Sequence, residues 1–442
     1  MYKYNHLLNV WHFSRNTLAF LEQQGGGVCR FTLGPHKMCL VNQPNLIESI
    51  YLREANQFVK PRLITKLGAT LFGDALTALD NQVWSSRRKL FAKAFTPTAI
   101  DTLISKSVKQ LDNHYEYRQL KSHEDVENYY RKLFVELYGN IFAGIELQEA
   151  SLSLSNDIGT ALEAYGTRLK IGVNIPDWIP LGMNRRLTSS MASIRATLRP
   201  VILKRLNETV DPSSVIGVLK SALACDSVSV EHVLDELLVM ITVGAHQSAN
   251  AVAWLYYLLA KNPQYQLIIA KESVECRQES WASSINEHYK ITAACVNESL
   301  RLFPPFYIIG REAICDCVVD GHKFSKRENV LVSAWVTQRD PRYFESPDEF
   351  IPERWLEKNA ISKFTYFPYG IGGRTCLAQL LLNRLLPVVV GRFLEKHSIQ
   401  MSEDNEVVPK PGATLGLKSP LKLKVDKRAA TANQHYEPAS VL

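Results

Sequence analysis

The stretch Phe367-Pro-Tyr-Gly-Ile-Gly-Gly-Arg-Thr-Cys-Leu-Ala378 decides the fold of this chain. Its three glycines in four positions let the backbone approach something flat, because glycine accepts conformations and close contacts that other residues do not. Cys376 follows Arg374 by two residues and precedes an apolar segment with a helical pattern. The positive end of a helix dipole and nearby amides favour a thiolate over a thiol. We therefore interpret Cys376 as a thiolate ligand of a metal centre.

A thiolate on haem iron pushes electron density toward bound dioxygen and favours O–O cleavage, and Arg374 would pair with a haem propionate. The stretch resembles the signature Phe-x-x-Gly-x-Arg-x-Cys-x-Gly of the cytochrome P450 haem-thiolate monooxygenases. Gly372, Arg374 and Cys376 match that signature. Tyr369 replaces its Phe, and Ala378 replaces its last Gly. The resemblance implies haem b with Cys376 as the iron ligand and with Tyr369 and Gly370 in the haem-binding loop.

A second element of the resemblance is a pair of charges before Pro304. Glu298 and Arg301 are three residues apart, which places both side chains on one face of a helix. A solvated surface pair would contribute little to stability. In the family, such a pair joins an arginine of a later segment, here Arg354 in Phe350-Ile-Pro-Glu-Arg-Trp355. The resemblance implies a structural cluster that locks the loop presenting the cysteine.

Further arginines are candidates for the haem propionates. Trp84 and Arg88 resemble the family's Trp-x-x-x-Arg helix, and Arg311 follows the segment after Pro304 where the family often has another such arginine. Buried anions need several cationic donors to offset the loss of hydration. For Arg311 a purely structural role is the alternative.

The middle of a long uncharged segment, Leu237 to Leu259, departs from the family. The family has Ala/Gly-Gly-x-Asp/Glu-Thr beside the iron, and this chain has Gly244-Ala245-His246-Gln247-Ser248. The resemblance assigns dioxygen access to Gly244 and Ala245 and proton delivery to Gln247 and Ser248. Glutamine donates and accepts hydrogen bonds but does not ionise, so it orients a water without supplying a proton. His246 is either a pocket residue or a core histidine with protein partners.

The resemblance places four segments on the distal side of the haem, nearly all apolar, which implies a mainly apolar substrate. Together with His246 they supply the substrate-pocket candidates Leu71, Phe72, Met240, Val243, Phe306, Tyr307, Ile308, Ala413 and Thr414.

Composition sets the broad class. The 442 residues are 46% hydrophobic and 21% charged, which excludes a disordered, collagen-like or disulfide-dense chain. The net charge of +7 does not argue for nucleic acid. Polar residues at the centre of 237–259 disfavour a membrane span, and neither a signal peptide nor a membrane anchor is visible. Seven of the eight cysteines are interpreted as small buried hydrophobes.

The patterns predict a mainly α fold with a small β-rich lobe. The resemblance implies the cytochrome P450 fold, with the haem between the long central helix and the helix after the cysteine loop. Strands are expected at Val28–Leu33 and Met38–Val41, irregular structure at 62–82, and long helices at Val230–Lys261 and Leu377–His397. We expect a single domain over 15–425 and a loose tail over 426–442.

The resemblance also implies the partners. A basic patch on one helix (Arg87, Arg88, Lys89 and Lys93) suits an acidic ferredoxin or flavodoxin, and we see no fused flavin reductase. We expect a soluble, cytoplasmic, monomeric enzyme of bacterial type in secondary metabolism, acting on a free or carrier-bound small molecule. Gln247 leaves open radical coupling, desaturation, ring closure or peroxide use. The alternative of another class is a haem protein that binds or senses without turnover.

Overall fold

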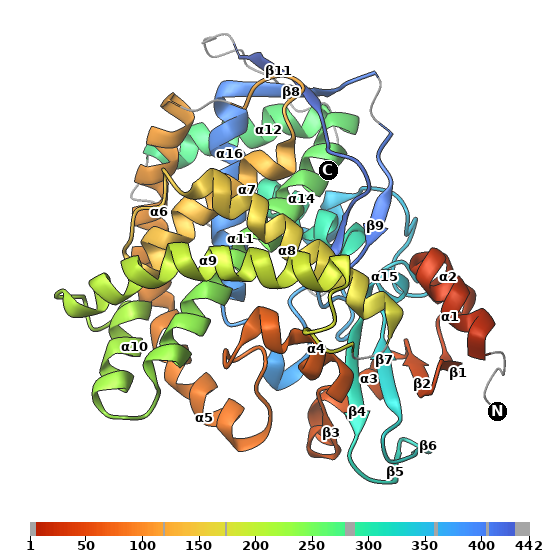
Figure 1. The fold of residues 1–442 in the computed structure, drawn as a ribbon. Helices are drawn as coiled ribbons and strands as arrows, with labels where there is room; N and C mark the ends of the chain where they lie inside the picture. Colours follow the sequence, from red (N-terminus) through yellow and green to blue (C-terminus); the bar gives the residue numbers. More distant parts are fainter. Residues whose placement is uncertain are drawn as a thin grey trace.

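The computed structural model describes residues 6–117, 120–172, 175–278, 288–357, 361–403 and 406–428. Helices make up most of it. In Figure 1, α8 and α9 cross in front of α11, and the strands of the large sheet lie to the lower right. The α-helices are α1 (His6–Arg15), α2 (Thr17–Gln23), α3 (Pro44–Glu48), α4 (Arg62–Phe72), α5 (Asn81–Ala92), α6 (Pro97–Tyr117), α7 (Val126–Tyr138), α8 (Ser151–Ile171), α9 (Gly182–Asn207), α10 (Val215–Ala224), α11 (Val230–Lys261), α12 (Gln264–Gln278), α14 (Lys290–Leu302), α15 (Ala334–Thr337) and α16 (Gln379–Lys396).

The central helix α11 confirms the expected bounds. Ser229 caps its N-terminus by accepting a hydrogen bond from the His232 amide at 3.1 Å, as short hydroxyl side chains do at helix starts. Its 32 residues span about 48 Å at 1.5 Å per residue. Most of its side chains are buried, because α7, α8, α14 and α16 surround it. Among the described residues, no helix is long and apolar enough to cross a membrane.

The described strands form one five-stranded sheet and three separate two-stranded pairs. The sheet has the order β1-β2-β7-β4-β3. The pairs are β5 with β6, β8 with β11, and β9 with β10, all antiparallel. The strands are β1 (Val28–Leu33), β2 (His36–Val41), β3 (Phe58–Val59), β4 (Ile309–Ala313), β5 (Cys317–Val319), β6 (His322–Phe324), β7 (Asn329–Val332), β8 (His397–Met401), β9 (Pro409–Pro411), β10 (Leu415–Leu417) and β11 (Leu423–Lys427).

Three expectations need correction. The segment 62–82 is not irregular throughout, because α4 occupies Arg62–Phe72 and buries Leu67 and Leu71. β-branched residues and Gly68 lower its helix propensity, and packing against α8 and α9 supplies the stability. The expected loose tail starts too early, because β11 pairs with β8 through Lys427; residues 429–442 lie outside the described residues. Finally, Cys225 and Cys315 are exposed rather than buried.

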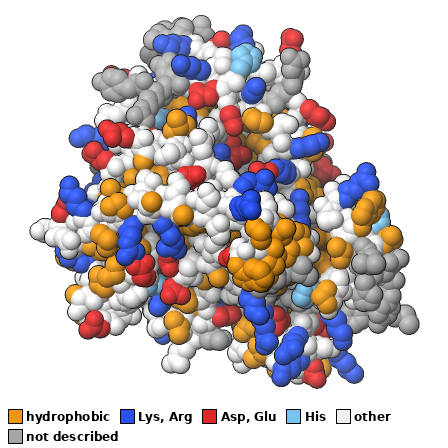
Figure 2. All heavy atoms as spheres, viewed as in Figure 1, with side chains coloured by type: hydrophobic (Ala, Val, Ile, Leu, Met, Phe, Trp, Pro, Cys, Tyr) orange, Lys and Arg blue, Asp and Glu red, His pale blue; other side chains and the backbone are white. Residues whose placement is uncertain are grey.

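The surface carries mixed charges on the face seen in Figure 2, where acidic and basic side chains alternate. The same view shows a compact hydrophobic patch over the connection between α8 and α9. In this connection Trp178 is 82% exposed and Leu181 is 40% exposed.

Candidate haem site

The cysteine loop turns sharply before α16. Gly370 and Gly372 have φ values of +89° and +68°, in the region that favours glycine. A Cβ on Gly372 would lie 2.4 Å from the carbonyl oxygen of Tyr51, so no larger residue fits there without movement. The Cys376 amide donates to the Tyr369 carbonyl at 2.8 Å. The loop therefore holds the cysteine in a fixed place, three residues before α16 begins.

The Cys376 side chain is exposed, although the surrounding protein limits its hydration. Burial raises the pKa of the Cys376 thiol, while the Ala378 amide and the Arg88 guanidinium lower it by less. These two groups act in the direction that the sequence predicts, toward the thiolate, and burial opposes them. In the protein alone, the loss of hydration has a larger effect on the pKa of the thiol than the Ala378 amide and Arg88 together. A bound metal cation would reverse that balance, because a coordinating thiol is deprotonated.

Cations gather on one side of this loop. Arg374 lies over the Trp84 ring at 4.2 Å and Arg88 at 5.7 Å. Arg374 also pairs with Asp80 and donates to the Leu79 carbonyl at 3.2 Å. Trp84 thus contacts two of the three arginines predicted to bind the propionates.

Arg311 and Lys60 complete this group. Arg311 lies over the Tyr51 ring at 4.5 Å, and within the described residues it has no carboxylate partner. Burial, with repulsion from Arg374 and Arg311, lowers the pKa of Lys60 to about 7. Lys60 is a residue that the sequence analysis missed, since no motif marks it. Crowded, partly dehydrated cations favour an anion between them, so this donor set fits the propionates of a haem.

The distal candidates lie on α11 and around it. Ser248 is buried, and its Oγ lies 2.5 Å from the hydroxyl of Tyr138, at the end of α7. A Cβ on Gly244 would lie 3.2 Å from the Tyr138 ring, so the small residue admits this tyrosine. Burial, with a smaller contribution from Cys376, raises the pKa of Tyr138. Tyr138 is a second residue that the sequence analysis missed, because only the tertiary packing brings it to Ser248.

Gln247 and His246 differ in their surroundings. The Oε1 atom of Gln247 is buried and has no hydrogen-bond partner among the described residues. Such an atom in a native protein generally meets a water or a ligand. His246, in contrast, has protein partners at both ring nitrogens, Arg131 at 3.2 Å and Thr414 at 3.3 Å. The structure thus favours the core-histidine alternative for His246. Ala245 is fully buried.

The remaining pocket candidates are placed as follows. Leu71, Tyr307 and Thr414 are buried, and Phe306 is 44% exposed. The other candidates are half-buried, namely Phe72, Met240, Val243, Ile308 and Ala413. They come from α4, α11, the segment before β4, and the turn between β9 and β10.

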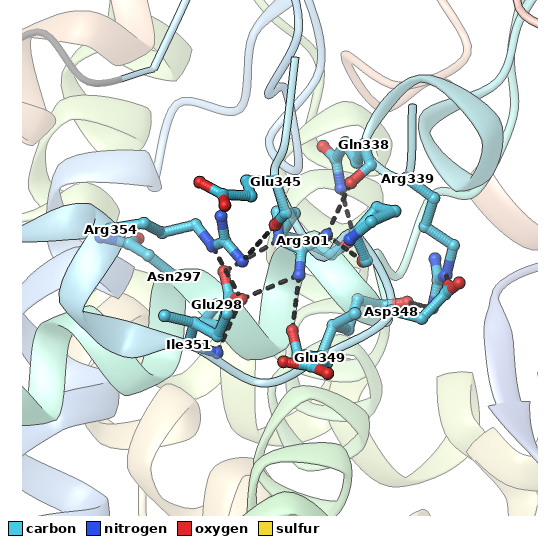
Figure 3. Close-up of polar contacts among 12 residues, drawn as sticks. Asn297, Glu298, Arg301, Gln338, Arg339, Glu345, Asp348, Glu349, Ile351 and Arg354 are labelled. Carbon is cyan, nitrogen blue, oxygen red and sulfur yellow. Dashed lines mark hydrogen bonds and ion pairs between the residues drawn. The ribbon is translucent and has the colours of Figure 1, made fainter. Parts of the chain in front are cut away.

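The charge cluster forms as expected and is drawn in Figure 3. Glu298 and Arg301 on α14 are fully buried and share two hydrogen bonds of 2.8 Å. Arg354 Nε donates to Glu298 Oε1 at 3.0 Å. The Ile351 amide and the Trp355 indole donate to the same carboxylate at 3.0 and 2.8 Å.

The cluster is connected to the start of the cysteine loop. Arg301 Nη1 donates to the carbonyls of Gln338 and Pro347 at 2.8 and 2.6 Å. The Gln338 amide group donates to the Arg301 carbonyl at 2.9 Å and accepts from the Phe367 amide at 2.9 Å. A buried ion cluster on α14 thereby holds the first residue of the loop that ends in Cys376.

Comparison with known proteins identifies the family. Residues 4–425 match the family model "Cytochrome P450". The chain belongs to this family. Its cofactor is therefore haem b bound through a cysteine thiolate, and the chain is a cytochrome P450 monooxygenase. When bound, the haem supplies the iron at which dioxygen is activated. Cys376 is the residue of this chain that would hold the iron, and Arg88, Arg311 and Arg374 would face the propionates.

Plants and bacteria both contain relatives of this chain. "Protein LUTEIN DEFICIENT 5, chloroplastic" from Arabidopsis thaliana is 26% identical, over 91% of this chain and 72% of that protein. "Carotene epsilon-monooxygenase, chloroplastic" from the same plant is 23% identical, over 91% and 80%. "Cyclooctat-9-en-7-ol 5-monooxygenase" from Streptomyces melanosporofaciens is 22% identical, over 93% and 88%. The crystal structure of CYP175A1 from Thermus thermophilus superposes with a TM-score of 0.77 at 19% identity, covering 96% of this chain and 99% of the other. That likeness confirms the predicted fold.

Proposed function

We propose that this P450 oxidises a mainly apolar molecule of the isoprenoid type, in secondary metabolism, with electrons from a separate ferredoxin or flavodoxin. The proposal rests on one observation: the hydroxyl groups of the pocket candidates already have hydrogen-bond partners within the protein. The Tyr307 hydroxyl already donates to the Gly412 carbonyl at 3.1 Å, and the Thr414 hydroxyl already pairs with His246. The other candidates are apolar, so the surface left for a ligand is hydrophobic.

The names of the relatives support this substrate class. One relative is a carotene monooxygenase and another acts on cyclooctat-9-en-7-ol. Both names denote molecules that are mostly or entirely hydrocarbon. An apolar site binds such molecules by removing their surface from water, which contributes roughly 25 cal/mol per Å².

The electron donor is inferred from the basic patch on α5. Lys89 on α5 is exposed, and so is Lys93, which begins the short 3-10 helix Lys93–Phe95 directly after α5. Arg87 is turned inward and donates to the Asp74 carbonyl at 3.0 Å. Arg88 is near enough to Cys376 to lower the pKa of its thiol. An acidic donor that docks on Lys89 and Lys93 would therefore approach on the side of the cysteine loop.

The substrate proposal is tested by optical titration of the ferric enzyme. We expect β-carotene in detergent micelles to shift the haem from low to high spin. A phenolic peptide at the same concentration should cause no shift. A shift with the peptide alone would contradict the proposal, and no shift with any free molecule would favour a carrier-bound substrate instead.

The donor proposal is tested by charge reversal. We expect Lys89→Glu combined with Lys93→Glu to raise the KM for a ferredoxin about tenfold at low salt and to abolish its salt dependence, because steering is screened by ions. Lys271→Glu is the matched control, since Lys271 is exposed on α12, at the opposite end of the molecule from α5 (Figure 1). Equal effects of the two changes would refute docking on α5.

Gln247 favours one further candidate within the same fold. Its Oε1 atom has no hydrogen-bond partner among the described residues, and the Ser248 hydroxyl is hydrogen-bonded to the Tyr138 hydroxyl. Neither group ionises readily, so the site is poorly equipped for proton delivery and better suited to radical coupling, desaturation or ring closure. Gln247→Glu separates the two functions. A large rise in coupled hydroxylation would favour the second candidate, and no change would make Gln247 peripheral.

A further inference from the structure

Three side chains of α11 hold the turn between β9 and β10. His246 Nε2 lies 3.3 Å from Thr414 Oγ1. The Leu415 carbonyl accepts two hydrogen bonds, one from Asn250 Nδ2 at 2.8 Å and one from Trp254 Nε1 at 3.1 Å. The three residues are spaced by four, so they form one stripe along the helix. We name His246, Asn250 and Trp254 the hairpin anchor.

Asn250 shows that the stripe serves the turn. The side chain is fully buried, and its Oδ1 atom has no hydrogen-bond partner among the described residues. A half-satisfied amide in a core costs free energy. Among the described residues, the Asn250 side chain makes its hydrogen bond to the Leu415 carbonyl through Nδ2. An apolar residue of the same shape would avoid the cost and leave the turn without that bond.

His246 is itself held in one tautomer. Arg131 Nη1 donates to His246 Nδ1 at 3.2 Å and to Glu127 at 3.2 Å. The proton of the neutral ring therefore lies on Nε2 and is donated to the Thr414 hydroxyl. Burial, with repulsion from Arg131, lowers the pKa of His246 to about 3, so the ring stays neutral near pH 7. The hydrogen bond thus has a fixed direction, from α11 to the turn.

Other elements close around the same turn. The Leu415 amide donates to the Pro305 carbonyl at 2.9 Å, and Tyr307 donates to the Gly412 carbonyl at 3.1 Å. On α8, a Cβ at Gly166 would lie 2.7 Å from the Ala413 amide nitrogen, so the helix meets the turn backbone directly. The turn therefore has little freedom in the intact structure.

We propose that the hairpin anchor sets the size of ligand that the distal pocket accepts, and hence the position oxidised, by fixing where Ala413 and Thr414 stand. The inference rests on the proposed function, in which these two residues line the pocket. The anchor residues are positioning residues, because they act through the turn.

The test uses the haem-loaded enzyme and two variants. Asn250→Leu removes one donor to the Leu415 carbonyl. Trp254→Phe removes the other and keeps a ring on Phe303, against which the indole stacks at 3.8 Å. Gln266→Leu is the matched control, because Gln266 is buried and its amide donates to the Ile399 carbonyl of β8 at 2.9 Å, in a different sheet.

Two readouts separate the role from a general loss of stability. The first is hydrogen exchange of the amides in 409–417, which should accelerate about five- to tenfold in the two anchor variants, as expected for the loss of about 1 kcal/mol. The second is the affinity for imidazole and for a biphenyl-substituted imidazole, measured by the Soret shift on binding to iron. We expect the affinity ratio to change at least fivefold in favour of the larger ligand in the anchor variants, and to stay constant in Gln266→Leu.

Unchanged exchange in 409–417, or an affinity ratio that moves equally in the control, would overturn the inference. If Asn250→Leu fails to retain haem, Trp254→Phe alone decides the question. Imidazoles bind to the iron whatever the native substrate is. A failure of β-carotene to shift the spin state would therefore concern only the proposed substrate and leave this test intact.

Discussion

Glu298→Gln tests how much the fold depends on the buried charge cluster. The Glu298 carboxylate accepts five hydrogen bonds of 2.8–3.0 Å, two from Arg301 and one each from Arg354, the Ile351 amide and the Trp355 indole. A glutamine keeps the shape but has one acceptor, so at least two donors would face its NH2 group. Each buried donor without a partner costs about 1–3 kcal/mol.

Charge adds to this cost. Arg301 is fully buried, and without Glu298 its remaining partners are carbonyl groups. Removing one member of a buried ion pair costs about 3–5 kcal/mol, against a typical total stability of about 5–15 kcal/mol. We expect Glu298→Gln to lose about 3–5 kcal/mol. With a denaturant slope of about 3 kcal/mol per molar or somewhat more, the urea midpoint should fall by about 1 M.

The measurement follows the thiolate-type carbon monoxide band of the reduced enzyme as urea is increased. Glu272→Gln provides the control, since Glu272 is a half-buried carboxylate that accepts from the neutral donors of Ile291 and Thr292. We expect the control to lose about 1 kcal/mol. If the two variants lose equal stability, or if Glu298→Gln loses less than about 1 kcal/mol, the buried charge is not what holds the cysteine loop.

Four further predictions follow from the site. Cys376→Ser should abolish the thiolate-type band of the reduced carbon monoxide complex; a band that persists would exclude Cys376 as the ligand. Tyr138→Phe removes only the hydroxyl beside Ser248 and should raise peroxide release per electron several-fold, whereas Tyr130→Phe, which loses a similar bond to Tyr256 on the same helix, should not. Lys60→Met should speed haem transfer to an acceptor globin, because it removes a cation near Arg311 and Arg374 together with its hydrogen bonds to the Thr77 and Leu79 carbonyls; an unchanged rate would refute this role of Lys60. Because the pKa of His246 falls from 6.5 to about 3 on folding, the unfolded chain binds the additional proton between these values, and stability should fall as pH drops from 6.5 toward 3. His246→Met should reduce this slope by at most about 1.4 kcal/mol per pH unit, measured by urea midpoints at several pH values.

The sequence predicts best what is local. The cysteine loop, the bounds of α11 and the pair Glu298–Arg301 are defined by residues close to one another in the chain. The glycine positions indicate the loop, the length of the uncharged segment indicates α11, and the spacing of three residues indicates the pair. The helix α4 was missed because its propensity is weak and its stability comes from α8 and α9, which follow about 80 to 140 residues later.

The site residues that were missed share one property. Tyr138 meets Ser248 across 110 residues, and Lys60 meets Arg374 across more than 300. No pattern in a single sequence marks such pairs. The effect of burial on the Cys376 thiol could not be predicted for a related reason. Its neighbours in sequence favour the thiolate, while the burial that opposes it is a property of the whole fold.

The helix α11 contacts several of the segments that surround the site. Residues two apart on a helix point in nearly opposite directions, at about 200° around its axis. Ser248 therefore faces Tyr138 on one side, while His246 faces the turn at Thr414 on the other. Nearer its N-terminus, the same helix accepts hydrogen bonds from the Asp74 and Leu76 amides through Asp235 and Glu236. A single rigid element thus holds three of the segments that surround the site. A substitution that shifts one of its contacts should consequently alter ligand size selection and proton delivery together, even where the residue touches neither haem nor substrate.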